Sequence, residues 1–165
     1  MFREMRRKAQ LLSHEEAVAI LEKGSSGVLA VSGDDGYPYA VPLSYLYKDN
    51  VIYFHCAKVG HKIDAVMKEP KVSFCVIDQD QVVPEEYTTY FRSVIAFGKA
   101  YIIEDEKEKM QAIRVLAEKY SPGRDDVDVA IAREYAGLCM IRMDIEHLAG
   151  KEAIELKKQH RGLTP

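Results

Sequence analysis

The chain has 165 residues, of which 47% are hydrophobic and 30% are charged, and its formal net charge is −3 at pH 7. This length and balance predict one soluble globular domain with a sizeable core, and the slightly acidic charge argues against broad electrostatic binding to nucleic acid. No apolar run reaches the roughly 18 residues of a membrane-spanning helix or resembles a secretory signal, and three cysteines without C-x-x-C spacing favour reduced thiols in a cytoplasmic protein.

A helix followed by a β-hairpin is predicted near the N-terminus. Ser13 followed by Glu16 forms a capping box, apolar residues follow at helical spacing, and Gly24 is a stop signal. Two β-like runs, 27–32 and 37–47, are joined by a Gly-Asp-Asp-Gly turn, which is typical of a hairpin. These local signals predict a helix that leads directly into two antiparallel strands.

Pro42 interrupts the second strand of this hairpin. Proline cannot donate a hydrogen bond to a ladder, so a strand that contains it is expected at a sheet edge, at a bulge or along an opening. A ligand would fit against such an interrupted backbone. The residue pattern favours neither a ligand-lined opening nor a simple edge strand.

Strands and helices continue along the rest of the chain. We expect strands over 51–57, 71–77, 90–104 and 138–145, and helices over 61–68, 106–120 and 125–136. Segment 78–89, which contains Pro84, is expected to be irregular, and the charged segment 151–165 to be a loosely ordered tail. Six strands without regular strand–helix alternation favour a mainly β fold, a six-stranded antiparallel barrel with peripheral helices in one domain over residues 1–150.

The turn after the 51–57 strand is the most informative stretch, because Lys58, Gly60, His61 and Lys62 stand where the next helix begins. Backbone N–H groups at a helix N-terminus are unpaired and favour an anion. Lys62 and protonated His61 would add positive charge, so the turn is suited to hold a phosphate. Solvated lysines and an ordinary cap histidine explain the same residues, and both interpretations stay open at this point.

Other kinds of site are less well supported by the residues. His55 and Cys56 are adjacent in a strand and point to opposite faces, so they cannot both reach one ion with His61, and no metal site is expected. The cysteines are flanked by apolar residues, which disfavours a Cys–His nucleophile. The chain also lacks the glycine-rich motifs of the common nucleotide-binding folds. Tyrosines in the β-rich half offer flat faces to a planar ligand as readily as to a core.

Five blocks of the sequence, taken in order, resemble the pyridoxamine-phosphate-oxidase-like split β-barrel superfamily of FMN-binding proteins, and within it the nitroimidazole-resistance branch. The blocks are MFREMRRKAQ, GYPYAVPLSYLY, IYFHCAKVGHKIDAVMKEPKVSF, SVIAFGKAYII and LCMIRMDIEHLAGKEA. Together they cover nearly the whole chain, and their order is more specific than any one block. The resemblance implies a split β-barrel.

The resemblance also implies FMN as the cofactor, bound at the interface of a homodimer. In this family a basic pair after the strand and turn binds the FMN phosphate. The strand before that pair and the second strand line the flavin, and a polar side chain of the long later strand reaches the ring. The matching positions, in that order, are His61 and Lys62; Phe54, His55 and Ala57; Val41, Pro42, Leu43 and Ser44; and Ser93.

The function implied by the resemblance is an FMN-dependent oxidoreductase. It would pass electrons from a reduced donor such as NAD(P)H to a small organic acceptor, for example a nitroaromatic compound. His55 is the candidate catalytic residue, because imidazole exchanges a proton near neutral pH, although a structural hydrogen bond is the alternative role. Pyridoxamine phosphate oxidation itself is not expected, because this chain lacks the Arg- and Trp-rich C-terminal segment of those enzymes. The alternative function is a non-catalytic module that binds flavin or haem.

Overall fold

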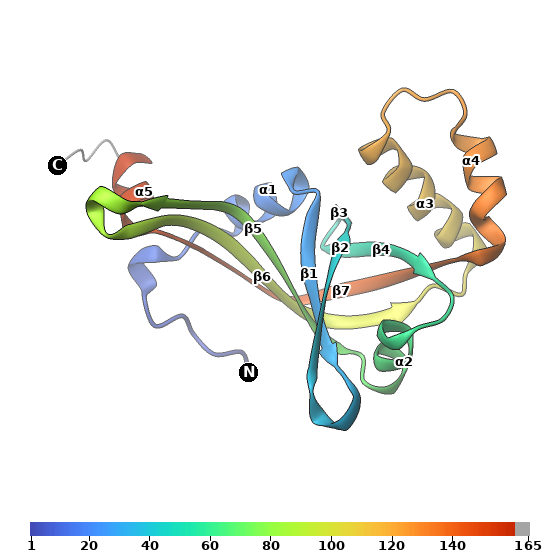
Figure 1. Cartoon of the computed structure of the whole chain (residues 1–165), viewed down its shortest axis with the longest axis horizontal. Helices are drawn as coiled ribbons and strands as arrows, with labels where there is room; N and C mark the ends of the chain where they lie inside the picture. The colour runs from blue at the N-terminus through green and yellow to red at the C-terminus, as the bar shows by residue number, and fades with distance from the viewer. Residues whose placement is uncertain (161–165) are drawn as a thin grey trace.

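The computed structural model describes residues 1–160, and its centre is a seven-stranded antiparallel sheet in the order β2-β1-β5-β6-β7-β4-β3 (Figure 1). The strands are β1 (Ser26–Ser32), β2 (Pro38–Ser44), β3 (Leu46–Lys48), β4 (Val51–Ala57), β5 (Lys71–Val83), β6 (Thr88–Ile102) and β7 (Leu138–Glu152). The helices are α1 (His14–Lys23), α2 (His61–Lys68), α3 (Glu106–Tyr120), α4 (Val127–Glu134) and α5 (Ile154–His160). The antiparallel sheet with peripheral helices agrees with the expectation, but the fold is mixed α/β rather than mainly β.

The strand count of six was wrong, because the single strand expected over 37–47 is divided at Tyr45 into β2 and β3. These two strands are consecutive in the chain but lie at opposite edges of the sheet. The sheet therefore has to roll up to bring its edges together. No ladder joins β2 to β3 or β4 within residues 1–160, so the barrel stays open along one seam.

Helix α1 begins after Ser13 and ends before Gly24, as predicted, and its start is fixed by the predicted capping box. The Ser13 side chain accepts a hydrogen bond from the Glu16 N–H at 3.1 Å, and the Glu16 carboxylate accepts one from the Ser13 N–H at 2.6 Å. This reciprocal capping box satisfies donors that the first helical turn leaves unpaired. Ala17 and Leu21 then bury one face of α1 against the inside of the sheet, where α1 packs on β3, β5, β6 and β7.

The segment 78–89, expected to be irregular, is instead part of a long β-hairpin that projects beyond the rest of the sheet (Figure 1). The β5–β6 register shifts between Ile77 and Gln79, and the hairpin turns at Pro84–Glu86. Polar residues dominate 78–89, and its valines, Val82 and Val83, are adjacent instead of alternating, so the sequence lacks the pattern of a half-buried strand. For that reason the sequence pattern does not predict the hairpin arm.

The C-terminal segment is more regular than expected. Strand β7 continues to Glu152 rather than ending at Ile145, and Ile154–His160 form α5. The part of the expected tail over residues 161–165 lies outside the described residues. Within residues 1–160, no helix combines the length and the apolar character that crossing a membrane requires.

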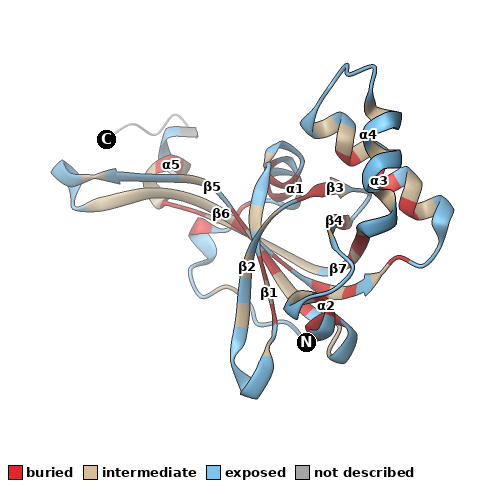
Figure 2. Cartoon of the chain, turned by 45° about the vertical axis from the view of Figure 1, so that its right-hand side comes forward, coloured by how far each residue is buried: buried red, intermediate tan, exposed pale blue. Residues whose placement is uncertain are grey.

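The main core lies inside the rolled sheet, where the buried residues gather in Figure 2. The Phe74 ring meets the rings of Tyr45 and Phe54 edge-on, at centroid separations of 4.9 and 5.0 Å. A second, smaller core forms where α3 packs on the outer side of β3 and β7, around Leu116 and Met140. Helices α3 and α4 thus form a separate layer, on the side opposite the hairpin arm (Figure 1).

Candidate functional site

The open seam of the barrel runs between unpaired edges of β2 and β4, which approach each other. Strand β3 pairs with β4 only from Val51 to Tyr53, so among residues 1–160 the stretch Phe54–Ala57 has no ladder partner on that side. Strand β2 is the outermost strand of the sheet, and in the part of the chain that the structure describes it pairs only with β1. Two stretches of main chain with unpaired polar groups therefore face one opening.

The position of Pro42 agrees with this arrangement. Gly33 N–H donates to Tyr37 O at 2.9 Å, and hydrogen-bonded and non-hydrogen-bonded pairs alternate along an antiparallel ladder. Counting from that bond puts the pair Val28–Pro42 at a non-hydrogen-bonded position, so the Pro42 nitrogen faces the open edge. Proline is tolerated because no ladder donor is needed there. Pro42 therefore lies both at an edge of the sheet and along the opening, the two positions that the sequence suggested for it.

The seam residues predicted from the sequence point to different sides. Phe54 is fully buried in the core, and Val41 and Leu43 pack against it. A ligand at the seam can therefore reach the main chain of all three residues, but not the Phe54 side chain. Side chains that are exposed at or beside the seam belong to Pro42, Ser44, His55 and Ala57.

Helix α2 begins at one end of the seam. Gly60 precedes it with φ +129°, a backbone conformation that side chains rarely adopt, and contributes no side-chain cap. The Gly60 carbonyl accepts hydrogen bonds from Ile63 N–H at 2.9 Å and Asp64 N–H at 3.2 Å. The N–H groups of His61 and Lys62 precede these and lie at the positions where a helix start binds anions.

The His61 ring is held by the β1–β2 hairpin. It stacks on the Tyr39 ring with a centroid separation of 4.2 Å and an interplanar angle of 16°. His61 Nε2 also lies 3.6 Å from Asp34 Oδ2. Tyr39 and Asp34 were not among the predicted site residues. Tyr39 lies in the strand that was singled out, but no sequence signal pairs its ring with a histidine 22 positions later.

Cys56 shows that the thiols beside the seam are poor nucleophiles. Cys56 lies directly opposite Cys139 in the β4–β7 ladder. Burial raises the pKa of the Cys56 thiol to about 12, Cys139 adds to the rise, and the positive charge of Lys62 opposes it. A thiol with so high a pKa stays protonated at neutral pH. Among residues 1–160, no group of three or more His, Cys, Asp or Glu side chains is placed to hold a metal ion.

Ser93 is the one predicted residue that this chain does not bring to the seam. Pro42, Val28, Cys75 and Ile95 lie side by side across β2, β1, β5 and β6. Three strand spacings separate Pro42 from Ile95, roughly 14 Å. Ser93 lies two residues from Ile95 on the same outer face of the sheet. Within a single chain, Ser93 therefore lies on the outer sheet face, well away from β2 and β4.

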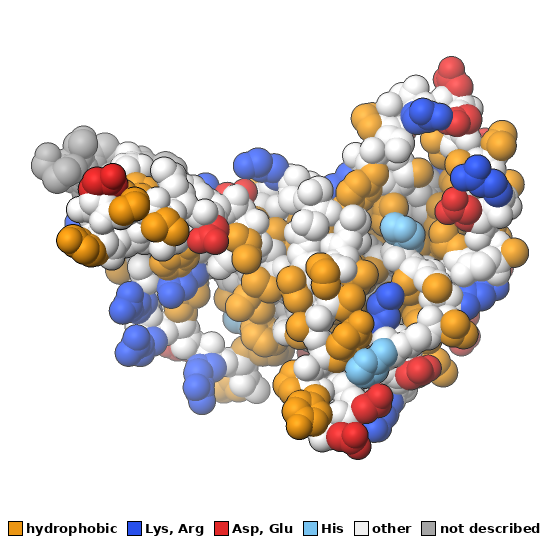
Figure 3. Space-filling view, viewed as in Figure 1, with side chains coloured by type: hydrophobic (Ala, Val, Ile, Leu, Met, Phe, Trp, Pro, Cys, Tyr) orange, Lys and Arg blue, Asp and Glu red, His pale blue; other side chains and the backbone are white. Residues whose placement is uncertain are grey.

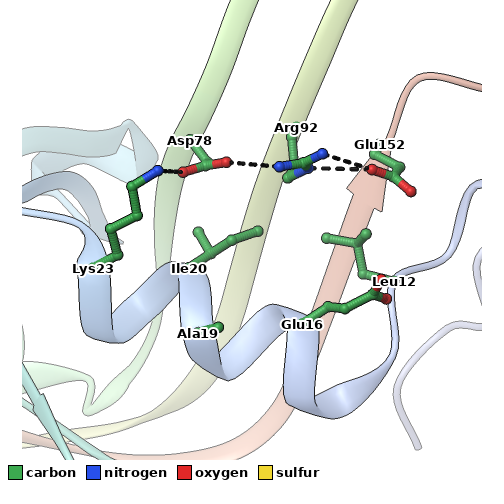
Figure 4. Close-up of a pocket in the computed structure, with 8 residues that line it drawn as sticks. All are labelled: Leu12, Glu16, Ala19, Ile20, Lys23, Asp78, Arg92 and Glu152. Carbon is green, nitrogen blue, oxygen red and sulfur yellow. Dashed lines mark hydrogen bonds and ion pairs between the residues drawn. The ribbon is translucent and has the colours of Figure 1, made fainter. Parts of the chain in front are cut away.

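The neighbour of Ser93 points to the other face. The Arg92 side chain extends between Asp78 and Glu152 in a cavity of about 280 Å³ beside α1 (Figure 4). Its Nη1 lies 3.3 Å from Asp78 Oδ2 and its Nη2 lies 3.1 Å from Glu152 Oε2. Lys23 Nζ completes the row at 3.3 Å from Asp78 Oδ1. Arg92 therefore ties β5, β6 and β7 together on the inner side of the sheet.

An antiparallel barrel split along one seam, with an anion-competent helix start at the end of the seam, defines a split-barrel protein suited to a phosphate-bearing cofactor. The family model described as pyridoxamine 5'-phosphate oxidase matches residues 13–152. The chain belongs to this family, whose members bind flavins. A search among curated proteins found no match.

Solved structures with the same fold include proteins of different roles. A candidate 5-nitroimidazole antibiotic resistance protein of Bacteroides thetaiotaomicron is 20% identical, with TM-score 0.72 and 86% of each chain covered. An FAD-binding protein of Mesorhizobium loti is 28% identical, with TM-score 0.66 and coverage of 87% of this chain and 97% of that one. An FAD- and haem-binding protein of Mycobacterium smegmatis is 19% identical, with TM-score 0.74 and coverage of 88% and 74%.

Proposed function

We propose that this protein is an FMN-dependent oxidoreductase whose flavin phosphate binds at the start of α2 and whose ring lies along the seam between β2 and β4. The observation that carries the proposal is that the helix start bearing His61 and Lys62 lies where the unpaired edges end. A phosphate there would meet helix N–H groups and the Lys62 ammonium. The unpaired main-chain groups of β2 and β4 would hydrogen-bond the edge of a planar ring.

The proposed site is completed by a second copy of the chain. The outer sheet face around Ser93 carries exposed apolar side chains, including Ile77 at 64% and Ile95 at 40% exposure. Contiguous apolar surface of this kind is typical of an interaction site. In a two-fold dimer through this face, the partner subunit's Ser93 would approach the seam that this chain's own Ser93 does not reach.

The chemistry of the proposed reaction divides between cofactor and protein. A bound flavin supplies reversible electron transfer. His61 and Lys62 hold the phosphate, and the seam orients the ring. His55 is exposed and is the second residue of the unpaired stretch Phe54–Ala57 of β4. Its imidazole can hold or release a proton there. The proposed donor is NAD(P)H and the proposed acceptor a small organic molecule, and the name of the Bacteroides neighbour supports a nitroaromatic acceptor.

The absorbance spectrum of the purified protein tests this proposal. We expect flavin bands, release of FMN on denaturation, and bleaching when NAD(P)H is added without oxygen. Reoxidation by a nitroimidazole with loss of the nitro absorbance would then establish turnover. A protein that takes up no flavin when FMN is supplied would refute the site, and one that binds FMN but is never reduced would refute the enzymatic role alone.

A non-catalytic carrier is the second candidate function. It is favoured by the Mycobacterium smegmatis neighbour, which is an FAD- and haem-binding protein, and by the Mesorhizobium loti FAD-binding protein. Chromatography of the released flavin separates FMN from FAD. A Soret band after haemin is added would favour the haem carrier, and a stoichiometric flavin that no donor reduces would favour storage.

A further inference from the structure

A cavity of about 550 Å³ lies between the N-terminal arm (residues 1–10), the start of α1 and the part of β7 that follows Glu146. Its volume is within the range of small-molecule sites. It is lined from β6 and β7 rather than from β2 and β4. None of the predicted flavin-site residues lines it, so it is a separate feature of the molecule.

The floor of this cavity is apolar. Leu11 and Phe97 line it and remain 41% and 37% exposed, and Met5, Leu148 and Ala149 complete the surface. The Phe2 ring lies on the ring of His147, one of the lining residues, at a centroid separation of 4.7 Å and an interplanar angle of 9°. Large apolar side chains that face a hollow favour a ligand with an apolar body.

Basic side chains gather at the rim of the cavity. Arg3, Lys8, His14 and His147 line it, with Glu4 as its one lining carboxylate. Glu4 already pairs with Lys8 at 2.8 Å, and Arg3, His14 and His147 make no ion pair within the described part of the chain. Figure 3 shows Lys and Arg side chains gathered along the N-terminal arm. The start of α1 is closed by its own capping box, so the side chains supply the positive charge.

We propose that this cavity binds an organic anion with an apolar body, such as a medium-chain carboxylate. The apolar body would lie on the Leu11 and Phe97 side chains. The carboxylate would lie at the rim beside Arg3 and the two imidazoles. The ligand is expected to contact the apolar floor and the cationic rim at the same time. An uncharged hydrocarbon would leave the rim without a partner, and a small anion would leave the floor uncovered. Phe97 and Ala149 line the cavity and lie beside Ile95 on the outer sheet face, so the proposal rests on the proposed dimer leaving this end of the face open.

Calorimetric titration of the flavin-loaded full chain with decanoate tests this proposal. Decanoate is expected to bind in a one-to-one ratio, and decyltrimethylammonium, which has the same chain length and the opposite charge, is expected to bind at least roughly tenfold more weakly. Equal affinity for the two probes, or no measurable heat with decanoate, would overturn the proposal. Release of flavin by decanoate would also overturn it, because the probe would then be using the flavin site.

Two matched variants locate the binding. Arg3→Glu should weaken decanoate roughly three- to tenfold, because it reverses a charge at the rim. Arg6→Glu makes the same change on the same arm at an exposed position that does not line the cavity, and it should leave the affinity within about twofold. Equal losses would mean that the arm attracts anions only through its overall charge. Leu11→Gln, at a half-exposed floor position, should also weaken decanoate, with the unfolding midpoint measured to confirm the fold.

Discussion

The hydroxyl of Tyr120, at the end of α3, bonds both main-chain groups of Tyr45, which lies 75 residues earlier in the chain. It accepts from Tyr45 N–H at 2.9 Å and lies 2.8 Å from Tyr45 O, with its single proton shared between that oxygen and the carbonyl of Ser25. Tyr45 is the one residue between β2 and β3, where the chain passes from one sheet edge to the other. One phenol therefore satisfies the backbone at the point where ladder bonds stop.

Replacing that hydroxyl should destabilise the junction. Tyr120→Phe leaves the buried Tyr45 N–H and C=O without their partner, and we expect a loss of about 1–3 kcal/mol in the free energy of unfolding. Chemical denaturation measures it. Tyr135→Phe is the control, because the Tyr135 hydroxyl bonds Glu106 at an exposed site. If the two variants lose the same stability, the Tyr45 junction has no special importance.

The two lysines of α2 separate the proposed phosphate site from general surface charge. Lys62→Ala should weaken FMN binding by about 1.5–3 kcal/mol, the range for hydrogen bonds to charged groups. Lys68→Ala removes an exposed charge at the other end of the same helix and should have little effect. Titration of FMN fluorescence reports both affinities. Wild-type affinity in Lys62→Ala would place the phosphate elsewhere.

Asp34 is expected to compete with a phosphate for His61. Its carboxylate lies 3.6 Å from His61 Nε2 and is largely exposed. Asp34→Asn should therefore strengthen FMN binding modestly, by about two- to fivefold at low ionic strength, and the gain should shrink as salt screens it. Asp35→Asn removes a neighbouring charge from the same turn and serves as the control. A gain in Asp35→Asn as large as that in Asp34→Asn would mean that only the net charge of the turn matters.

The outer sheet face should hold two copies of the chain together. Ile95 is 40% exposed at the centre of this face, so Ile95→Asp places a charge in the proposed interface at little cost to the isolated chain. Sedimentation analysis should show a wild-type dimer and a monomeric variant that binds FMN more weakly. Val129→Asp, on the exposed side of α4, should change neither property. A wild-type monomer that binds FMN with full affinity would refute the two-copy site.

Much of the secondary structure was predictable because its signals are local. The capping box at Ser13, the stop at Gly24 and the helical apolar spacing of 106–120 act within a few residues, and α1 and α3 begin and end where those signals lie. The arm formed by 78–89 was not predictable in the same way. Its strands are stabilised by pairing with each other and not by burial, and pairing leaves little trace in the hydrophobic pattern.

For the candidate site, the residues themselves determined that a basic turn precedes a short helix and that a proline interrupts a strand. Only the tertiary structure decided that β2 and β4 leave facing edges unpaired, that the Tyr39 ring covers His61, and that Ser93 stays on the outer face. The reason is physical. Helix starts and turns depend on neighbouring residues, whereas sheet order and ring contacts depend on which distant segments pair when the barrel rolls up.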